Sequence, residues 1–403
     1  MKIVQINATT KIGSTGKIMY EIDDVLKKSG HMGYMVSAYT TDYQIKNQYC
    51  MNKADYLKPL KKNILISRIT GTMGYRYKNE TKKMLEWVDS KKPDIIHLHN
   101  IHGDWLHLKS LFEYLKEKNI PVVWTLHDCW AFTGRCSHFE LCGCNKWMNH
   151  CGGCCNRSVY PVTYFFDFSR KMLIDKKNMF TSIQNLTLVT PSNWLKKYVE
   201  KSFLGKYQID VIHNGIDTSK YINSGKKVFN NKKKVILGVA SSWSSTKGLD
   251  DFIELDKMID HDVYRIVLVG LNKSQYKKIP TTIYGIQRTN DEQELIDIYS
   301  SAFVFVNLTY QDNFPTTNLE ALACGLPVIT YNTGGSPESI TEKTGVVVKT
   351  GDLDGVVNAI KQVEKINRNE CRVSVINSLD KRICFDKYLK LYESIIENNQ
   401  VDI

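Results

Sequence analysis

Two carboxylates, Asp312 and Glu320, bracket the start of a predicted helix. The segment reads DNFPTTNLE, so a polar loop containing Pro315 leads into an apolar helical run. Free N–H groups at a helix N-terminus bind anions, and a phosphate is therefore expected at the first helical turn. The residues of that turn are Thr316, Thr317 and Asn318. The pattern predicts an anion site flanked by two carboxylates.

A lysine follows a second apolar run at a place suited to phosphate chemistry. Val235–Val239 is a predicted buried strand, and the polar loop ASSWSSTK after it ends at Lys247 and enters a helix. A cation at the carboxyl end of a parallel strand can neutralise a diphosphate leaving group. We expect Lys247 to do so. A second cation for the diphosphate is not assigned. Arg288, which follows the run 283–286, is a candidate.

Histidines end two further predicted strands. The run Val122–Leu126 leads to His127, at the kind of strand end where such sheets bind ligands. His97, His99 and His102 mark another strand end and could line an acceptor side. Because most single histidines are structural, His127 is the one to which we assign a function.

Seven of the eleven cysteines lie between Cys129 and Cys155. Closely spaced thiols in a cytoplasmic chain indicate metal binding more than disulfides. The spacing fits a four-thiolate zinc site made of Cys136, Cys144, Cys151 and Cys154. Cys142, His138 or His150 could substitute as ligands. Free thiols or redox-active pairs are the alternative to a structural zinc ion.

The elements that position these residues alternate between two kinds. Short apolar runs typical of buried parallel strands are separated by amphipathic helical stretches. The predicted strands are Ile3–Ile6, Ile95–Leu98, Val122–Leu126, Leu186–Val189, Val235–Val239, Arg265–Val269, Val304–Val306 and Val328–Tyr331. This alternation predicts an α/β protein with two doubly wound sheets.

The length of 403 residues predicts two domains. The hydrophobic pattern weakens between Lys197 and Lys234, so we expect a first domain over 1–205, which contains a cysteine-rich insertion over 129–155. The second domain is expected over 206–384. Residues 385–403 read as a final helix that could pack back on the first domain.

The net charge of +12 is unevenly distributed. Eight basic residues and one acid, Glu80, lie between positions 58 and 83, interleaved with apolar side chains: Lys58, Lys61, Lys62, Arg68, Arg76, Lys78, Lys82 and Lys83. Such a segment fits an anionic membrane surface, although a solvated helix gives the same pattern. No apolar run is long enough to span a membrane, which predicts a cytoplasmic protein, peripheral at the inner face of the membrane. Nucleic acid is not expected, because the cysteine-rich segment carries few cations.

The segment from Asp312 to Glu320 resembles the E-x7-E signature of the family 4 retaining glycosyltransferases. The resemblance implies that Glu320 holds the ribose of a nucleotide and that Asp312, in place of the usual Glu, lies near the transferred sugar. Ser242 stands where the family often carries an arginine. Phe314 joins the donor-binding residues, and His127 is implied to lie close to the donor sugar. In the first half, Gly16, in the segment GSTGK, belongs to a glycine loop that approaches the donor phosphates.

The resemblance covers nearly the whole chain and implies a GT-B fold, in which two Rossmann-like domains face a cleft. The expected reaction moves a hexose from a nucleoside diphosphate sugar to a glycan or polyprenyl-linked acceptor, with retention and without a required cofactor. Bacterial capsule, exopolysaccharide or lipopolysaccharide synthesis is the expected setting. An inactive GT-B scaffold, or a nucleic-acid-binding protein with a zinc module, is the alternative.

Overall fold

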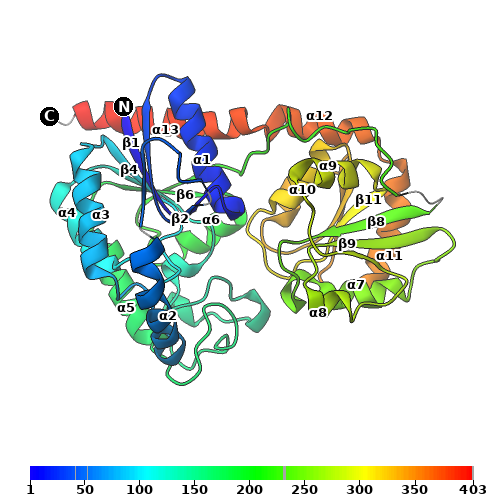
Figure 1. Ribbon diagram of the computed structural model, residues 1–403, viewed down its shortest axis with the longest axis horizontal. Helices are drawn as coiled ribbons and strands as arrows, with labels where there is room; N and C mark the ends of the chain where they lie inside the picture. Colours follow the sequence, from blue (N-terminus) through cyan, green and yellow to red (C-terminus); the bar gives the residue numbers. More distant parts are fainter. Residues whose placement is uncertain (41, 52, 230–232, 402–403) are drawn as a thin grey trace. The chain divides into compact units, whose positions relative to one another are not determined.

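The structure is a computed structural model, and it describes residues 1–40, 42–51, 53–229 and 233–401; for 53–61 and 399–401 it describes the backbone without the side chains. The chain divides into two compact units (Figure 1). The first contains Met1–Ile212 and Phe385–Ile403, and the second contains His213–Cys384.

The first unit is built on a seven-stranded sheet whose strands all pair in parallel. The strands are β1 (Lys2–Thr10), β2 (Met32–Thr40), β3 (Gln48–Cys50), β4 (Ile95–Leu98), β5 (Val122–Thr125), β6 (Leu186–Thr190) and β7 (Gln208–Val211). Their order is β3-β2-β1-β4-β5-β6-β7, so the direction of winding changes between β1 and β4. In such sheets ligands bind at the carboxyl ends of the strands, at this change of direction.

The helices of the first unit connect these parallel strands. They are α1 (Gly13–Lys28), α2 (Lys53–Thr70), α3 (Lys78–Ser90), α4 (Leu108–Lys118), α5 (Ser169–Phe180) and α6 (Asn193–Glu200). In the core, Phe112 of α4 and Phe180 of α5 pack with ring centroids 4.5 Å apart, and Trp124 of β5 meets Phe180 edge-on at 4.9 Å. Such aromatic contacts add about 0.5–1.5 kcal/mol each to the hydrophobic gain.

The segment between β5 and α5 forms loops and three short 3-10 turns, which are Trp130–Phe132, Glu140–Cys142 and Lys146–Met148. Phe132, Phe139 and Trp147 are buried in it and contact one another. This segment, which carries most of the cysteines, therefore packs its aromatic side chains into the hydrophobic core of the first unit.

The second unit repeats the architecture with six parallel strands in the order β10-β9-β8-β11-β12-β13. The strands are β8 (Lys234–Val239), β9 (Tyr264–Val269), β10 (Tyr284–Ile286), β11 (Val304–Asn307), β12 (Val328–Tyr331) and β13 (Gly345–Val348). The helices are α7 (Leu249–Asp256), α8 (Lys273–Tyr276), α9 (Glu292–Ser301), α10 (Thr316–Ala323), α11 (Leu353–Gln362) and α12 (Arg368–Ser378), with 3-10 turns at Ser245–Lys247, Ser336–Ser339 and Val363–Lys365. Here the winding changes direction between β8 and β11.

The last helix, α13 (Lys381–Val401), begins in the second unit and continues in the first. Within the first unit, Tyr392 OH lies 2.6 Å from His97 Nδ1, and Tyr388 OH lies 3.0 Å from Thr125 Oγ1. His97 and Thr125 belong to β4 and β5, so buried hydrogen bonds hold the helix to the sheet.

All eight strands predicted from apolar runs are present, and the two doubly wound sheets are confirmed. The expected change of domain near residue 205 comes before β7, but the first sheet continues through this strand because Thr187–Thr190 pairs with Gln208–Val211. The structure therefore divides after Ile212. The basic segment 58–83 covers most of α2, the stretch between the two helices and the start of α3, so it is not one continuous helix.

Candidate functional site

The carboxyl ends of β8 and β11 are neighbours where the second sheet changes direction. Lys247 closes the 3-10 turn after β8, and Asp312 lies in the loop after β11. Lys247 Nζ donates a hydrogen bond of 2.6 Å to Asp312 Oδ2, and the two side chains are 36% and 24% exposed. The structure thus brings two predicted site residues into contact at the place where ligands bind in such sheets.

Two glycines allow the loops that carry this ion pair to approach the chain closely. At Gly248, with φ of +76°, an added Cβ would lie 2.2 Å from Leu308 O. At Gly334, with φ of +58°, an added Cβ would lie 1.7 Å from Asp312 O. Glycine is needed at both positions, since any side chain would collide with the main chain and strain the backbone. Main-chain packing therefore fixes where Lys247 and Asp312 lie.

Phe314, predicted on the donor side, is buried and braces the loop. Its ring stacks on His213 with centroids 4.8 Å apart, and its carbonyl accepts a 3.1 Å hydrogen bond from Asn214 Nδ2. His213 Nε2 lies in turn 3.3 Å from Glu338 Oε2, in the turn after β12. The sequence did not identify these braces, because they come from segments far apart in the chain.

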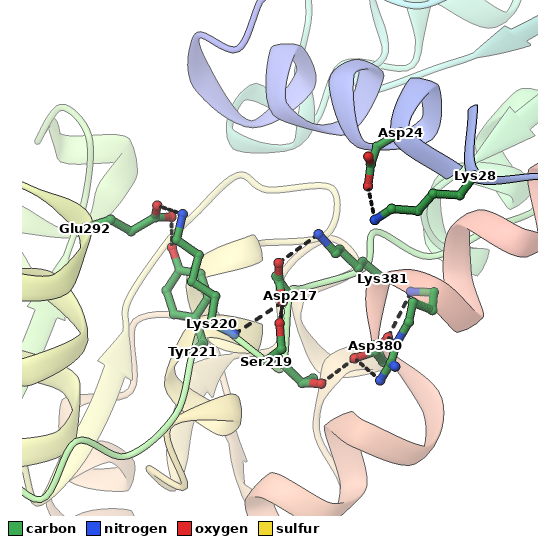
Figure 2. A network of polar contacts seen from close by, with 11 residues as sticks. Asp24, Lys28, Asp217, Ser219, Lys220, Tyr221, Glu292, Asp380 and Lys381 are labelled. Carbon is green, nitrogen blue, oxygen red and sulfur yellow. Dashed lines mark hydrogen bonds and ion pairs between the residues drawn. The ribbon is translucent and has the colours of Figure 1, made fainter. Parts of the chain in front are cut away.

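The segment that carries His213 is itself tied down by charged contacts (Figure 2). Asp217 pairs with Lys381 at 2.7 Å, and Tyr221 OH donates a 2.8 Å hydrogen bond to Glu292 at the start of α9. Lys220 also pairs with Glu292. These contacts hold the start of the second unit in place beside the loop of Phe314.

Glu320 lies in the middle of α10 and is half-buried. The buried Tyr299 of α9 donates a hydrogen bond of 3.0 Å to Glu320 Oε2. The carboxylate is thereby oriented by a side chain that cannot rotate freely. Such an oriented carboxylate suits the two hydroxyl groups of a ribose, which donate hydrogen bonds.

The first turn of α10 leaves part of its main chain available. Its N-cap, Pro315, forms no side-chain capping hydrogen bond, and Thr316 and Thr317 are half-exposed. Asn318 differs, because its buried side chain accepts from Asn307 at 2.8 Å and donates to Ser339 at 3.0 Å. The Asn318 side chain thus joins α10 to its neighbours and is not free to hold a ligand.

Three other residues were predicted on the donor side. Ser242 is exposed in the loop after β8. Arg288 is exposed after β10, two strands from β8 and so about 10 Å along the same sheet edge. In the first unit, Gly16 of α1 packs on the end of β1, where an added Cβ would lie 2.8 Å from Thr9 Oγ1. Ligand contacts by these three residues remain predictions.

His127 lies at the carboxyl end of β5 and contacts a second histidine. Its Nε2 is 3.1 Å from His99 Nδ1, and the two rings stack with centroids 5.4 Å apart. Burial lowers the pKa of His127 to about 4, so the ring is neutral near pH 7. A neutral imidazole can accept or donate a hydrogen bond to a sugar hydroxyl.

The other predicted histidines separate into two environments. His97 and His99 are fully buried, and burial holds the pKa of each ring well below its usual value. His97 contacts α13 and Thr125, and His99 Nε2 lies 3.2 Å from Gln5 Oε1, so both belong to the interior. His102 lines a small pocket together with His127, and His99 forms part of the same wall.

That pocket contains a carboxylate to which the sequence assigned no role. Asp128 Oδ2 lies 3.0 Å from His102 Nε2, and Asp128 Oδ1 accepts a hydrogen bond from the N–H of Trp130. Burial favours the neutral acid, but His102 and the other donors outweigh it and lower the pKa of Asp128 to about 2. An ionised carboxylate beside His127 is suited to accepting hydrogen bonds from hydroxyl groups. The sequence feature that could have identified Asp128 is its position directly after His127.

The four cysteines predicted as ligands line one small cavity, together with Arg135, Lys146 and Trp147. Cys136 Sγ and Cys154 Sγ are 3.8 Å apart. Another set of three thiols, Cys142, Cys144 and Cys155, has sulfur atoms within 4.8 Å of one another. The cysteines that the sequence grouped by spacing thus share a cavity, and Cys144 also belongs to the second set.

Comparisons with known proteins agree with this geometry. Residues 70–220 match the model described as Glycosyltransferase Family 4, and residues 221–378 match the model described as Glycosyl transferases group 1. The chain belongs to the family 4 glycosyltransferases of group 1. These matches confirm the prediction that the chain is a glycosyltransferase with the GT-B fold.

Relatives of this glycosyltransferase include other bacterial sugar transferases. It is 25% identical over 279 residues to a putative colanic acid biosynthesis glycosyl transferase of Escherichia coli, covering 67% of each chain. It is 26% identical over 178 residues, 41% of this chain and 46% of the relative, to N,N'-diacetylbacillosaminyl-diphospho-undecaprenol alpha-1,3-N-acetylgalactosaminyltransferase of Campylobacter jejuni. The second alignment thus spans less than half of that enzyme.

A solved structure shows the same fold over the whole length. A glycosyltransferase from Rickettsia africae superposes with a TM-score of 0.68 at 17% identity, covering 98% of this chain and 99% of the other. Among the described residues of our glycosyltransferase, no helix is long and apolar enough to cross a membrane.

Proposed function

We propose that this glycosyltransferase transfers a sugar from a nucleoside diphosphate sugar to a glycan or polyprenyl-linked acceptor during synthesis of a bacterial surface polysaccharide. The proposal rests on the ion pair between Lys247 and Asp312, which lies beside the first turn of α10. Glu320 lies farther along the same helix. Cation, helix N–H groups and carboxylate match the diphosphate and ribose of such a donor. The named relatives supply the polysaccharide setting.

In this proposal the second unit binds the donor and stabilises the leaving group. Glu320 accepts hydrogen bonds from the ribose, and the N–H groups of Thr316 and Thr317 face the phosphates. Lys247 leaves its ion pair with Asp312 and binds the diphosphate. It then neutralises the charge that develops as the glycosidic bond breaks. These groups perform the electrostatic work from the chain's own residues, and the proposal requires no cofactor for the transfer.

We further propose that the anomeric configuration is retained. The leaving phosphate oxygen takes the proton of the attacking hydroxyl on the same face of the sugar, so no enzyme nucleophile is needed. Asp312 and His127 are proposed as sugar-facing residues. Proton NMR of the product made from an α-linked donor tests this step, and a β-linked product would contradict it.

The donor site is tested by calorimetry with UDP, GDP and ADP on the wild type, on Glu320→Ala and on the control Glu254→Ala, whose carboxylate pairs only locally with Lys257 on the surface of α7. We expect one nucleotide to bind, the Glu320 variant to bind it at least 10-fold more weakly, and the control to match the wild type. Absence of binding to folded wild-type protein would overturn the proposal and favour the inactive scaffold.

The sequence suggested that the basic segment 58–83 contacts the membrane. We propose a different surface for this contact. Arg76, one of the eight basic residues, is paired with Asp104 at 3.0 Å, and the side chains of Lys58 and Lys61 lie outside the described residues. Apolar residues are also spread around α2 and not collected on one face. The basic segment alone therefore makes a weak membrane anchor.

A loop of aromatic residues beside the end of α2 is a stronger candidate for membrane contact. Its large side chains are between 38% and 69% exposed: Tyr164, Phe165, Phe166 and Phe168. Tyr164 N–H donates to Arg68 O at 2.7 Å, and Phe166 N–H donates to Ile69 O at 3.1 Å, so the loop is pinned to the helix. Exposed cations surround it, namely Lys62, Arg68, Arg157, Arg170 and Lys171.

We propose that this aromatic loop and its cations contact an anionic membrane, which would bring the enzyme to a lipid-linked acceptor. Aromatic rings suit the interface, and nearby cations are attracted to anionic headgroups. Sedimentation with vesicles of phosphatidylglycerol and phosphatidylcholine should show at least 10-fold weaker binding for Phe165→Ser/Phe166→Ser, based on about 1.5 kcal/mol for each ring removed. Tyr43→Ser, at another exposed aromatic residue, is the control. Equal binding of all three proteins would contradict the proposal.

A further inference from the structure

The cysteine-lined cavity has no part in the donor site and lies in the first unit. It is walled by Cys136, Cys144, Cys151 and Cys154 with the aromatic rings of Phe139 and Trp147. Its volume is about 20 Å³, and about 10–15 Å³ already holds one water-sized occupant. Four cysteine side chains thus line one small space, although no three of their sulfur atoms lie within 4.8 Å of one another, so a bound ion has to draw them together.

The spacing of one pair of these sulfur atoms fits a metal better than a disulfide. Cys136 Sγ and Cys154 Sγ are 3.8 Å apart, whereas bonded sulfurs are separated by about 2.05 Å. In a zinc tetrahedron with bonds of about 2.3 Å, neighbouring sulfurs are about 3.8 Å apart. This pair therefore already has the separation of two zinc ligands.

Main-chain N–H groups point at the same thiols. The N–H of Gly134 donates to Cys151 Sγ at 3.3 Å, and main-chain hydrogen bonds from Lys146 and Asn156 reach Cys144 and Cys154. A neutral thiol is a weak acceptor, whereas a thiolate is a good one. Donors directed at three of the four sulfurs therefore indicate sites that carry negative charge.

Arg135 gives an independent indication. Its side chain is 2% exposed and lines the same cavity, and none of its three guanidinium nitrogens has a hydrogen-bond partner. Asp167 is a nearby carboxylate, but it accepts its hydrogen bonds from the N–H groups of Cys154 and Ser169. A buried guanidinium without acceptors costs several kcal/mol, which metal-bound thiolates at this cavity would offset.

A second buried basic residue lies next to the cavity. Lys176 is 1% exposed and donates to the carbonyls of Trp130 and Thr133, of which Thr133 also lines the cavity. One divalent ion with four thiolates carries a net charge of −2. Arg135 offsets half of this charge, and Lys176, whose pKa is lowered by burial, lies beside the same cavity.

We propose that Cys136, Cys144, Cys151 and Cys154 bind one zinc ion and that Arg135 donates hydrogen bonds to the metal-bound thiolates. Binding releases the four thiol protons to solvent, and no oxidant is involved. The ion fixes the segment between β5 and α5, including Trp130, whose N–H holds Asp128. Zinc is thus a structural support for the pocket of His127.

The competing group is Cys142, Cys144 and Cys155. It offers three sulfurs, Cys155 is exposed, and neither Cys142 nor Cys155 lines the cavity with Arg135. These differences provide matched controls for the experiment.

Metal content is measured by mass spectrometry on the full-length protein purified under reducing conditions. We expect about one zinc per chain in the wild type, in Cys142→Ser and in Cys155→Ser, and a loss of most zinc in Cys136→Ser and Cys151→Ser. Retention in the last two variants with loss in Cys155→Ser would place the metal at the other group and overturn the proposal. Absence of zinc from the wild type, with fewer free thiols on denaturation, would replace it by disulfides.

Two measurements apply if the cysteine variants fail to fold. X-ray absorption of the zinc protein should give four sulfur neighbours at about 2.3 Å, and fewer sulfurs would contradict the site. Arg135→Met should lower zinc affinity by about 10–100-fold in competition with a chelator, and Arg135→Lys should lower it less. Unchanged zinc affinity in Arg135→Met would contradict the proposed hydrogen bonds from Arg135 to the thiolates.

Discussion

Lys247 Nζ lies 2.6 Å from Asp312 Oδ2, so the cation assigned to the donor diphosphate is neutralised by a carboxylate of the same site. Both side chains are partly exposed, and ion pairs of that kind contribute about 0.2–1 kcal/mol. A diphosphate can therefore displace the carboxylate at little cost. Once displaced, Asp312 is released to contact the transferred sugar.

This competition predicts opposite effects of two substitutions on nucleotide binding. Lys247→Ala removes a charged donor and should weaken nucleoside diphosphate binding by about 10–100-fold. Asp312→Asn frees the lysine and should tighten binding by up to about 5-fold, while it lowers the transfer rate. Calorimetry and initial rates measure both effects. Equal weakening by the two substitutions would mean that the pair binds the donor as a unit.

Tyr299 should act through Glu320 and not through the ligand itself. Tyr299→Phe removes the hydroxyl that orients Glu320 and should weaken nucleotide binding by about 3–10-fold, consistent with a hydrogen bond to a charged group. In a Glu320→Ala background the same change should have no further effect on the dissociation constant. Tyr264→Phe, at a more exposed hydroxyl near Glu364, is the control. Additive effects would contradict the positioning role.

Gly334→Ala should destabilise the second unit because the added Cβ collides with Asp312 O. Gly225→Ala is the matched control, since Gly225 also has positive φ but an added Cβ there meets nothing within 4 Å. Positive φ alone costs about 1–2 kcal/mol, and the Gly334 variant should lose at least about 1 kcal/mol more free energy of unfolding. Urea titration measures the difference. Equal losses would show that the loop relaxes around the new side chain.

The fold was largely predictable because buried parallel strands are continuous apolar runs. The strand Met32–Thr40 was missed because Gly33, Ser37 and Thr40 interrupt its apolar pattern. Ser37 is nevertheless fully buried, and Gln48 of β3 donates a hydrogen bond of 3.2 Å to it. A polar residue can occupy a central strand when a partner from another segment satisfies it, and no local pattern reveals that partner.

The candidate site was predictable where its residues share a local motif. Asp312 and Lys247 lie in loops after apolar runs, and Glu320 lies in the helix that follows Asp312, so their type and position along the chain were enough to select them as candidates. Tyr299 and His213 were missed because their roles depend on contacts with other segments. The buried side chains of Asn318 and Phe314 make contacts that the sequence does not display, and their assignment to the donor remains a prediction.

Tyr392→Phe should weaken the attachment of α13 to the first unit. The hydroxyl lies 2.6 Å from His97 Nδ1 in a buried environment, and its removal leaves a ring nitrogen without that partner. A loss of about 1–3 kcal/mol in the free energy of unfolding is expected. Denaturant titration measures it, with Tyr276→Phe, at a 47% exposed position, as the control. No loss relative to the control would mean that the hydrogen bond adds nothing to the attachment.

The stability of the first unit should fall in mild acid because His127 is buried in its neutral form. Its pKa of about 4 in the folded protein lies below the ordinary value of 6.5, so between these two pH values the unfolded chain binds a proton that the folded chain does not. Stability is therefore complete above about pH 6.5 and declines as the pH falls toward 4. The slope for this one group is about 1.4 kcal/mol per pH unit.

His127→Gln removes that proton uptake and should reduce the slope of unfolding free energy against pH by about this amount between pH 6 and 5. Acid also protonates other groups, and those that do not contact His127 contribute equally to both proteins and cancel in the comparison. His99 contacts His127, so its share is included in the difference. His261→Gln, at a 42% exposed histidine of the second unit, is the control and should keep the wild-type slope. An unchanged slope in His127→Gln would mean that His127 takes up its proton in the folded protein, which would contradict a neutral ring beside Asp128.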